Sequence, residues 1–203
     1  MNRTLIIITT LNLLTPIYSF ADPEFELARI LQVGTTMTQA PKYMGISINL
    51  YRVAKAEKID DIKDLQNEIE KAKDKKVDLY KITTDLAIIF SNKAVPFDDL
   101  TITTIPHKML FGNMVSKTVG YREIGGFIPS SEVAIICKYI REHNLQTFEG
   151  FAKLYDNVSK EAKTELIEMG NLDKKELFSY LKPLTDFYFA AEKDNNSIII
   201  AGE

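Results

Sequence analysis

The sequence predicts an α+β domain: a small mixed β-sheet packed by several helices, with a helix-rich C-terminal half and a terminal strand that returns to the sheet. Two hydrophobic periods alternate along the chain. Apolar residues at every second position favour strands, whereas apolar residues three or four positions apart favour amphipathic helices. The closing run Ser197–Ala201 is apolar on both faces, which is typical of a strand inside a covered sheet.

The first 21 residues resemble a secretory signal peptide. A basic residue precedes an apolar run of about 13 residues, Leu5–Ile17, within the usual length of a signal-peptide core. Ser19 and Ala21 then provide the small residues that signal peptidase requires before its cleavage site. The alternative is that Leu5–Ile8 begins a buried strand. We expect cleavage between Ala21 and Asp22, which would make the protein periplasmic or secreted.

Removal of residues 1–21 would leave about 180 residues, enough for one domain with a sizeable core. We expect an N-terminal extension and linker over residues 22–43, with a short helix around Glu24–Gln32, and a single α+β domain over residues 44–203. The formal net charge is −3, and the removed segment carries one basic residue. This mild acidity argues against nucleic acid as a partner, because phosphate binding requires a clustered basic surface. The apolar N-terminal run is also too short for stable membrane insertion.

The first half of the domain mixes strand and helix patterns. Gly45–Val53 alternates apolar residues with small or polar ones, which predicts a strand. A second helical pattern runs from about Leu79 to Ser91. Between them, Asp60 or Asp61 is expected to cap a helix. The apolar positions of that helix are Ile62, Leu65, Ile69 and Ala72.

A long loop is predicted over Val95–Gly120, with extended segments near each of its ends. Leu100–Ile105 is rich in Thr and Ile, which favours a strand, and Pro106 is expected to end it. Ile124–Ile128 is a second extended segment, and its glycines indicate a turn or bulge.

The second half of the chain is mainly helical. The last helical pattern contains Pro183, which should kink or divide the helix, and it ends at the turn signal Asp194–Asn196. Four residues have side-chain oxygens placed ahead of an apolar helical pattern, as N-caps do. They are Ser130, Thr147, Asn157 and Asp173.

Few residues offer catalytic or metal-binding chemistry. The single cysteine, Cys137, lies on the apolar face of a predicted helix and is expected to be a buried, inert thiol. Of the two histidines, His143 ends a helix beside Arg141, and His107 follows Pro106 in a predicted loop without ligands at metal-binding spacing. No serine-hydrolase elbow, zinc-protease or paired-cysteine motif occurs. We therefore expect no cofactor and no metal, and we assign no catalytic residue.

Short stretches from about Met44 to the C-terminus resemble a known family. Met44–Leu50 is similar to the start of that family's sequences, where Met-Gly precedes a strand. Val77–Lys81 is similar to a Leu-Asp-Leu-Asp-Lys stretch. Gly120-Tyr121 with Gly126–Val133 is similar to the segment before a Thr-Pro-Glu-Glu-Val helix, and Leu181–Gly202 to a last helix and closing strand. These features resemble the YfbM-like family (domain of unknown function 1877), whose members are bacterial proteins of unknown function.

The chain departs from this family at its most conspicuous cluster. Where the family has Asp-Lys-x-Trp followed by His, this chain has Tyr80, Lys81, Thr83 and Ala87. The extension before Met44 is also foreign to the family pattern. The resemblance therefore transfers no functional residue to this chain.

Two classes of function remain. The first is an exported binding protein, most concretely an immunity protein that neutralises a toxin by occluding its active site. The alternative is a small exported enzyme, such as a hydrolase, whose site forms only in three dimensions from a carboxylate or His107. A structural envelope protein without a tight partner is a third reading.

The predicted loop Val95–Gly120 is the candidate contact surface for a protein partner, because loops on a rigid scaffold commonly carry function. Aromatic and charged residues are mixed in it as in interface hot spots. The alternative is that Met109, Leu110 and Phe111 simply fill the core. The candidate partner-binding residues are Phe97, Asp98, Asp99, His107, Lys108, Phe111 and Asn113.

Overall fold

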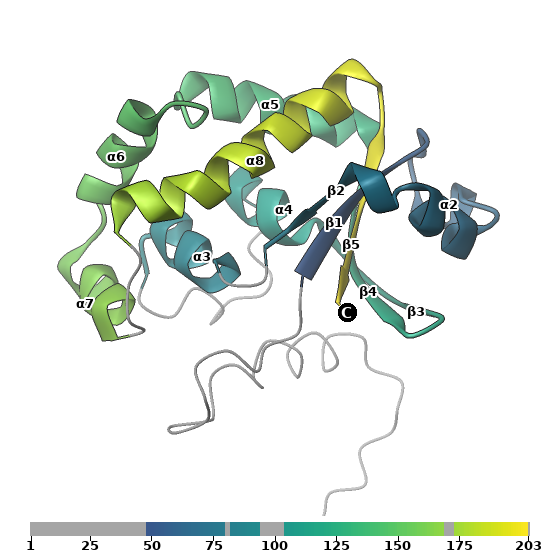
Figure 1. Cartoon of the computed structure of the whole chain (residues 1–203), viewed down its shortest axis with the longest axis horizontal. Coiled ribbons are helices and arrows are strands. Elements are labelled where there is room, and N and C mark those ends of the chain that lie inside the picture. The colour runs from purple at the N-terminus through teal and green to yellow at the C-terminus, as the bar shows by residue number, and fades with distance from the viewer. Residues whose placement is uncertain (1–47, 80–81, 94–103, 169–172, 203) are drawn as a thin grey trace, which may run out of the picture.

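The computed structural model describes residues 48–79, 82–93, 104–168 and 173–202. The predicted signal peptide, N-terminal extension and helix around Glu24–Gln32 lie outside these residues. Within them, the α+β class is confirmed (Figure 1). Five strands form one sheet in the order β2-β1-β5-β4-β3, and every pairing is antiparallel rather than mixed. The strands are β1 (Ile48–Val53), β2 (Lys76–Asp78), β3 (Asn113–Val119), β4 (Arg122–Ile128) and β5 (Ser197–Gly202).

Helices cover both faces of the sheet. In Figure 1, α2 lies on one side and the remaining labelled helices lie on the other. The helices are α2 (Leu65–Lys71), α3 (Thr83–Ser91), α4 (Ile105–Phe111), α5 (Ser130–Glu142), α6 (Phe148–Asp156), α7 (Lys160–Glu168) and α8 (Lys174–Lys193), with short 3-10 turns η1 (Ile59–Asp61) and η2 (Lys73–Lys75).

The alternation of side chains along each strand divides the core into two layers. Ile198 and Ile200 of β5 face the larger helical layer, whereas Ile199 and Ala201 face the smaller layer under α2. β5 pairs with β1 on one side and β4 on the other, so it is central. The prediction of a buried terminal strand is therefore confirmed.

The helix predicted to follow an Asp60 or Asp61 cap begins later than expected. Asp60 and Asp61 lie in η1, where the Asp61 carboxylate accepts a hydrogen bond from the Lys58 backbone N–H. The N-cap of α2 is Asp64, whose side chain accepts from Asn67 N at 3.1 Å. The 3-10 turn delays the start of the helix by several residues, so the cap prediction was wrong.

The helix predicted over Leu79–Ser91 begins at Thr83. Leu79 and Ile82 lie before it, although both are buried, because the chain first leaves the short edge strand β2. That strand, Lys76–Asp78, was missed: three residues beside a lysine-rich helix end give no strand period.

Two of the four N-cap predictions were right. Thr147 accepts from Gly150 N, and Asp173 accepts from Lys175 N and Glu176 N. Asn157 is instead the C-cap of α6, and Ser159 accepts from Ala162 N at the start of α7.

The N-cap of α5 was also misassigned. Pro129 takes the cap position in extended geometry, and Ser130 is the first helical residue. The hydroxyls of Ser130 and Ser131 both donate to the Glu57 carboxylate, at 3.1 and 2.7 Å. Further along the chain, α8 runs without interruption through Pro183, so this proline does not divide it.

The segment predicted as a long loop contains regular structure. Ile105 begins α4, and Pro106 lies in its first turn instead of ending a strand, while residues 100–103 lie outside the described part. β3 then occupies most of the predicted loop after Gly112. His107 consequently lies on a helix and not in a loop.

Candidate functional site

Local sequence fixes both ends of α4, the helix that carries the predicted contact residues. Thr104 is extended and its hydroxyl oxygen accepts from His107 N at 3.4 Å, and Pro106 suits the first turn because it has no N–H to lose. Gly112 ends the helix at a φ of +68°, a conformation that side chains with a Cβ rarely adopt. A Cβ at Gly112 would also lie 2.9 Å from the Phe127 backbone nitrogen.

The inner face of α4 is part of the main core. Met109, Leu110 and Phe111 are all buried, as expected if these residues fill the core. The Tyr188 hydroxyl of α8 donates to the Met109 carbonyl at 2.7 Å in a fully buried contact. This bond fixes the C-terminal turn of α4 against α8.

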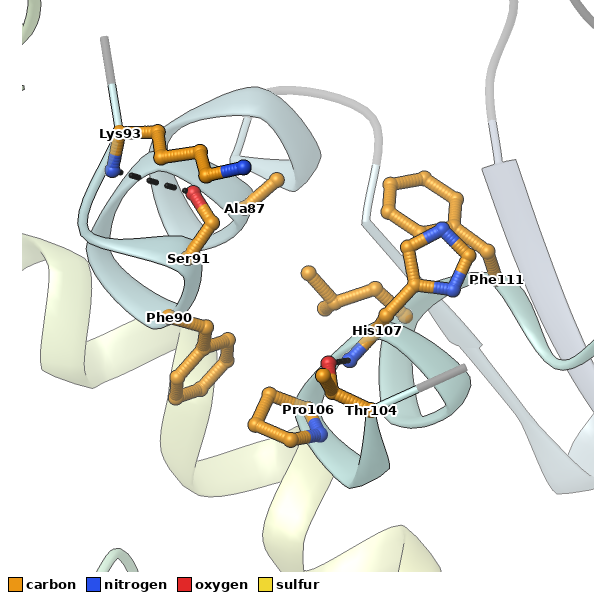
Figure 2. Close-up of a pocket in the computed structure, with 9 residues that line it drawn as sticks. Ala87, Phe90, Ser91, Lys93, Thr104, Pro106, His107 and Phe111 are labelled. Carbon is orange, nitrogen blue, oxygen red and sulfur yellow. Dashed lines mark hydrogen bonds between the residues drawn. The ribbon is translucent and has the colours of Figure 1, made fainter. Parts of the chain in front are cut away.

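A cavity of about 380 Å³ lies between α3 and α4 (Figure 2). Figure 2 shows Phe90 of α3 facing Pro106 of α4 across it. The His107 and Phe111 rings, one helical turn apart on α4, have centroids separated by 5.0 Å. The described residues that line it are Ala87, Phe90, Ser91, Lys93, Thr104, Pro106, His107, Leu110 and Phe111.

The cavity has few polar groups, and they differ in charge and in hydrogen bonding. Burial lowers the pKa of His107 below its ordinary value of 6.5, which favours the neutral ring at pH 7. The Ser91 hydroxyl donates to the Ile88 carbonyl at 3.4 Å and accepts from Lys93 N at 3.3 Å. None of the described lining residues is acidic, and Lys93 is the one among them with a formal charge. The described part of the cavity wall therefore offers no carboxylate that would orient His107 as a general base.

Lys108 and Asn113 lie away from this cavity lining and meet at one carboxylate. Lys108 Nζ binds Glu132 Oε2 at 2.8 Å, and Asn113 Nδ2 donates to Glu132 Oε1 at 3.2 Å. The Lys108 and Glu132 side chains are 24% and 26% exposed. These contacts connect α4, β3 and α5, so Lys108 and Asn113 help to hold the three elements together.

The structure therefore separates the predicted contact set. His107 and Phe111 line the cavity, whereas Lys108 and Asn113 bind Glu132. The residues of α3 that complete the cavity were missed, because the sequence indicates only the core-facing side of that helix. Phe97, Asp98 and Asp99 lie outside the described residues.

Other chemistry-bearing residues have ordinary environments. Cys137 is fully buried, as predicted, and burial with the nearby Glu192 carboxylate raises the pKa of its thiol to about 12. His143 is the C-cap of α5, and its ring lies 4.3 Å from that of Tyr139.

The described residues contain no cluster of three or more His, Cys, Asp or Glu side chains placed to hold a metal ion. None of the helices in this part of the chain combines the length and apolarity needed to cross a membrane. Comparison with protein-family models, curated proteins and solved structures found no match for this chain.

Proposed function

We propose that this chain is an exported binding protein, most concretely an immunity protein that neutralises a toxin by occluding its active site. The observation that carries the proposal is the composition of the cavity between α3 and α4. Its described walls are mainly apolar, a few polar groups lie among them, and none of the described lining residues is acidic. Such a lining suits recognition, in which aromatic and aliphatic walls receive an anchor and a few polar groups orient it.

The rigid attachment of α4 supports a binding role. Tyr188 holds its C-terminal turn, and Lys108 joins it to Glu132 of α5. A surface fixed in advance loses little conformational entropy when a partner binds, which improves affinity without additional contact area. Export of the protein is proposed from the sequence of residues 1–21.

The sharpest test pairs a cavity substitution with a matched one elsewhere. Each reading frame adjacent to the gene for this protein would be expressed with an export signal, and host growth measured with and without this chain. We expect one product to be toxic, and the wild-type chain to restore growth. His107→Glu puts a carboxylate against the apolar wall and should abolish protection, whereas His143→Glu, at the end of α5, should retain it.

Thermal melts of both variants, purified from the periplasm, would separate a binding defect from misfolding. Full protection by a folded His107→Glu protein would exclude the cavity as the contact site. If no adjacent product is toxic in the periplasm, the immunity function itself fails.

One observation favours the alternative, a small exported hydrolase. The neutral His107 ring and the Ser91 and Thr104 hydroxyls all line the same cavity. An enzyme of this kind would hydrolyse short p-nitrophenyl esters, and His107→Gln would lower kcat by at least about 100-fold, as loss of a general base does. Unchanged turnover in that variant would remove this alternative.

A further inference from the structure

The size of the cavity between α3 and α4 limits what it can hold. Its volume of about 380 Å³ is near the lower end of the range for small-molecule sites, roughly 300–1,000 Å³. That space suits a ligand of roughly ten to fifteen non-hydrogen atoms, well below the size of a dinucleotide.

The apolar walls require a ligand with an apolar body. Five of the nine described lining residues are apolar, and they come from both helices. Phe90 and Pro106 face each other across the gap (Figure 2). Leu110 and Phe111 are buried, so their side chains are held in place by the core beneath them. An alkyl chain or an aromatic ring between these walls would leave water at a gain of about 25 cal/mol per Å² of apolar surface.

The charge of Lys93 indicates which polar group a ligand of this cavity should carry. Lys93 has no ion pair within the described part of the chain, whereas Lys108 on the neighbouring helix is held by Glu132. In Figure 2 the Lys93 side chain runs back across the α3 wall of the cavity. The described lining residues include no carboxylate, so none of them competes with an anion for the Lys93 ammonium group.

A monoanion fits this site better than a phosphate group. One lysine is the formal cation among the described lining residues, and burial lowers the pKa of His107, which favours its neutral ring at pH 7. A phosphate dianion is usually held by several cations, or by backbone N–H groups at a glycine-rich turn or a longer helix N-terminus. The described lining residues offer neither arrangement, because they include one lysine and no glycine, and α4 has only seven residues.

We propose that the cavity between α3 and α4 binds a small apolar carboxylic acid, with its carboxylate at Lys93 and its alkyl or aryl body between Phe90, Pro106 and Leu110. Such a ligand goes beyond the proposed immunity function and does not depend on it. A chain that inhibits no toxin would still have this site.

The test uses octanoate and 4-phenylbutyrate as probes of the protein in its natural processed form. Isothermal titration calorimetry should detect saturable binding of one molecule of each acid. Two-dimensional NMR spectra should show shifts concentrated at Ala87, Ser91 and His107 and absent from the α2 side of the sheet. Octanamide, which has the same chain without the charge, and acetate, which has the charge without the chain, should each bind at least about tenfold more weakly, the factor that corresponds to about 1.4 kcal/mol.

A matched pair of lysine variants tests whether the Lys93 ammonium group binds the carboxylate. Lys93→Gln should weaken octanoate binding about tenfold at low salt and leave octanamide binding unchanged, since only the acid uses the ammonium group. Lys75→Gln is the control, because Lys75 lies in η2, between α2 and β2 in the chain, and is not among the cavity-lining residues. This variant should bind both probes as the wild type does. Ala87→Leu narrows the cavity and should weaken both probes, with circular dichroism melts showing whether the variant is folded.

Several results would overturn the assignment. Absence of binding by both acids at millimolar concentration would mean that the cavity is not a carboxylate site. Equal losses in Lys93→Gln and Lys75→Gln would indicate general charge attraction. Tighter binding of inorganic phosphate than of octanoate would assign the cavity to a different anion. Toxin protection is not read in any of these measurements, so their failure is distinct from failure of the immunity function.

Discussion

Replacement of Tyr188 by Phe tests how α4 is held in place. The Tyr188 side chain is fully buried and its hydroxyl donates to the Met109 carbonyl at 2.7 Å. That carbonyl is in the last turn of α4, where the final four C=O groups of a helix have no partner within the helix. Tyr188→Phe keeps the ring and removes the donor, so it leaves a buried carbonyl without this bond. The expected loss of unfolding free energy is about 1–3 kcal/mol.

Urea unfolding followed by circular dichroism measures this loss, and for a domain of this size each kcal/mol corresponds to roughly 2–4 °C in Tm. Tyr139→Phe is the matched control: its ring is only half-buried, and no hydrogen bond of its hydroxyl is found within the described residues. That variant should change stability by less than about 0.5 kcal/mol. Equal stability of the two variants would refute the view that the Tyr188 bond fixes α4.

Three described residues and one cleavage site give the remaining predictions. Ile199→Asp places a charge in the fully buried central strand and should cost several kcal/mol, so a soluble variant with unchanged melting would contradict the burial of β5. Cys137, with a thiol pKa of about 12, should react with a disulfide reagent at pH 8 only after denaturant is added. Burial lowers the pKa of His107, so as the pH falls the unfolded state binds a proton at this residue before the folded state does. The contribution of neutral His107 to folding stability is therefore present above about pH 6.5 and is lost as the pH falls through the folded pKa. NMR titration should give a His107 midpoint below 6.5, and His107→Gln should reduce this acid dependence. Mass spectrometry of the periplasmic fraction should find Asp22 as the N-terminus, and Met1 in the cytosol would contradict export.

Elements with a strong period or an unambiguous cap could be predicted from the sequence. Thr147 and Asp173 each precede an apolar helical pattern and accept backbone hydrogen bonds as expected. The central position of β5 followed from its apolar residues on both faces, because only a strand covered on both sides buries them all. The resemblance to the YfbM-like family stays a prediction.

Errors occurred where two local signals competed. Ser130 follows Pro129 and has the side chain of an N-cap, yet its hydroxyl donates to Glu57, a residue 73 positions away. A contact at that separation cannot be inferred from local composition. Leu100–Ile105 has the β-branched residues of a strand, but Thr104 followed by Pro106 is also typical of a helix start. At Ile105 the structure follows the helix signal.

The candidate site shows why local order in the sequence is a poor guide to shared function. His107 and Lys108 are neighbours in the chain, but a helix rotates successive residues by about 100°, so they face different surroundings. His107 reaches the cavity with Phe111, four residues later, whereas Lys108 reaches Glu132 on α5. Had α4 been predicted as a helix, the four-residue spacing would have placed His107 and Phe111 together. The opposite wall, with Phe90 and Lys93, depends on the packing of α3 against α4, and no periodicity in either segment specifies that partner. The half of the site on α4 was therefore within reach of sequence reasoning, and the half on α3 required the fold.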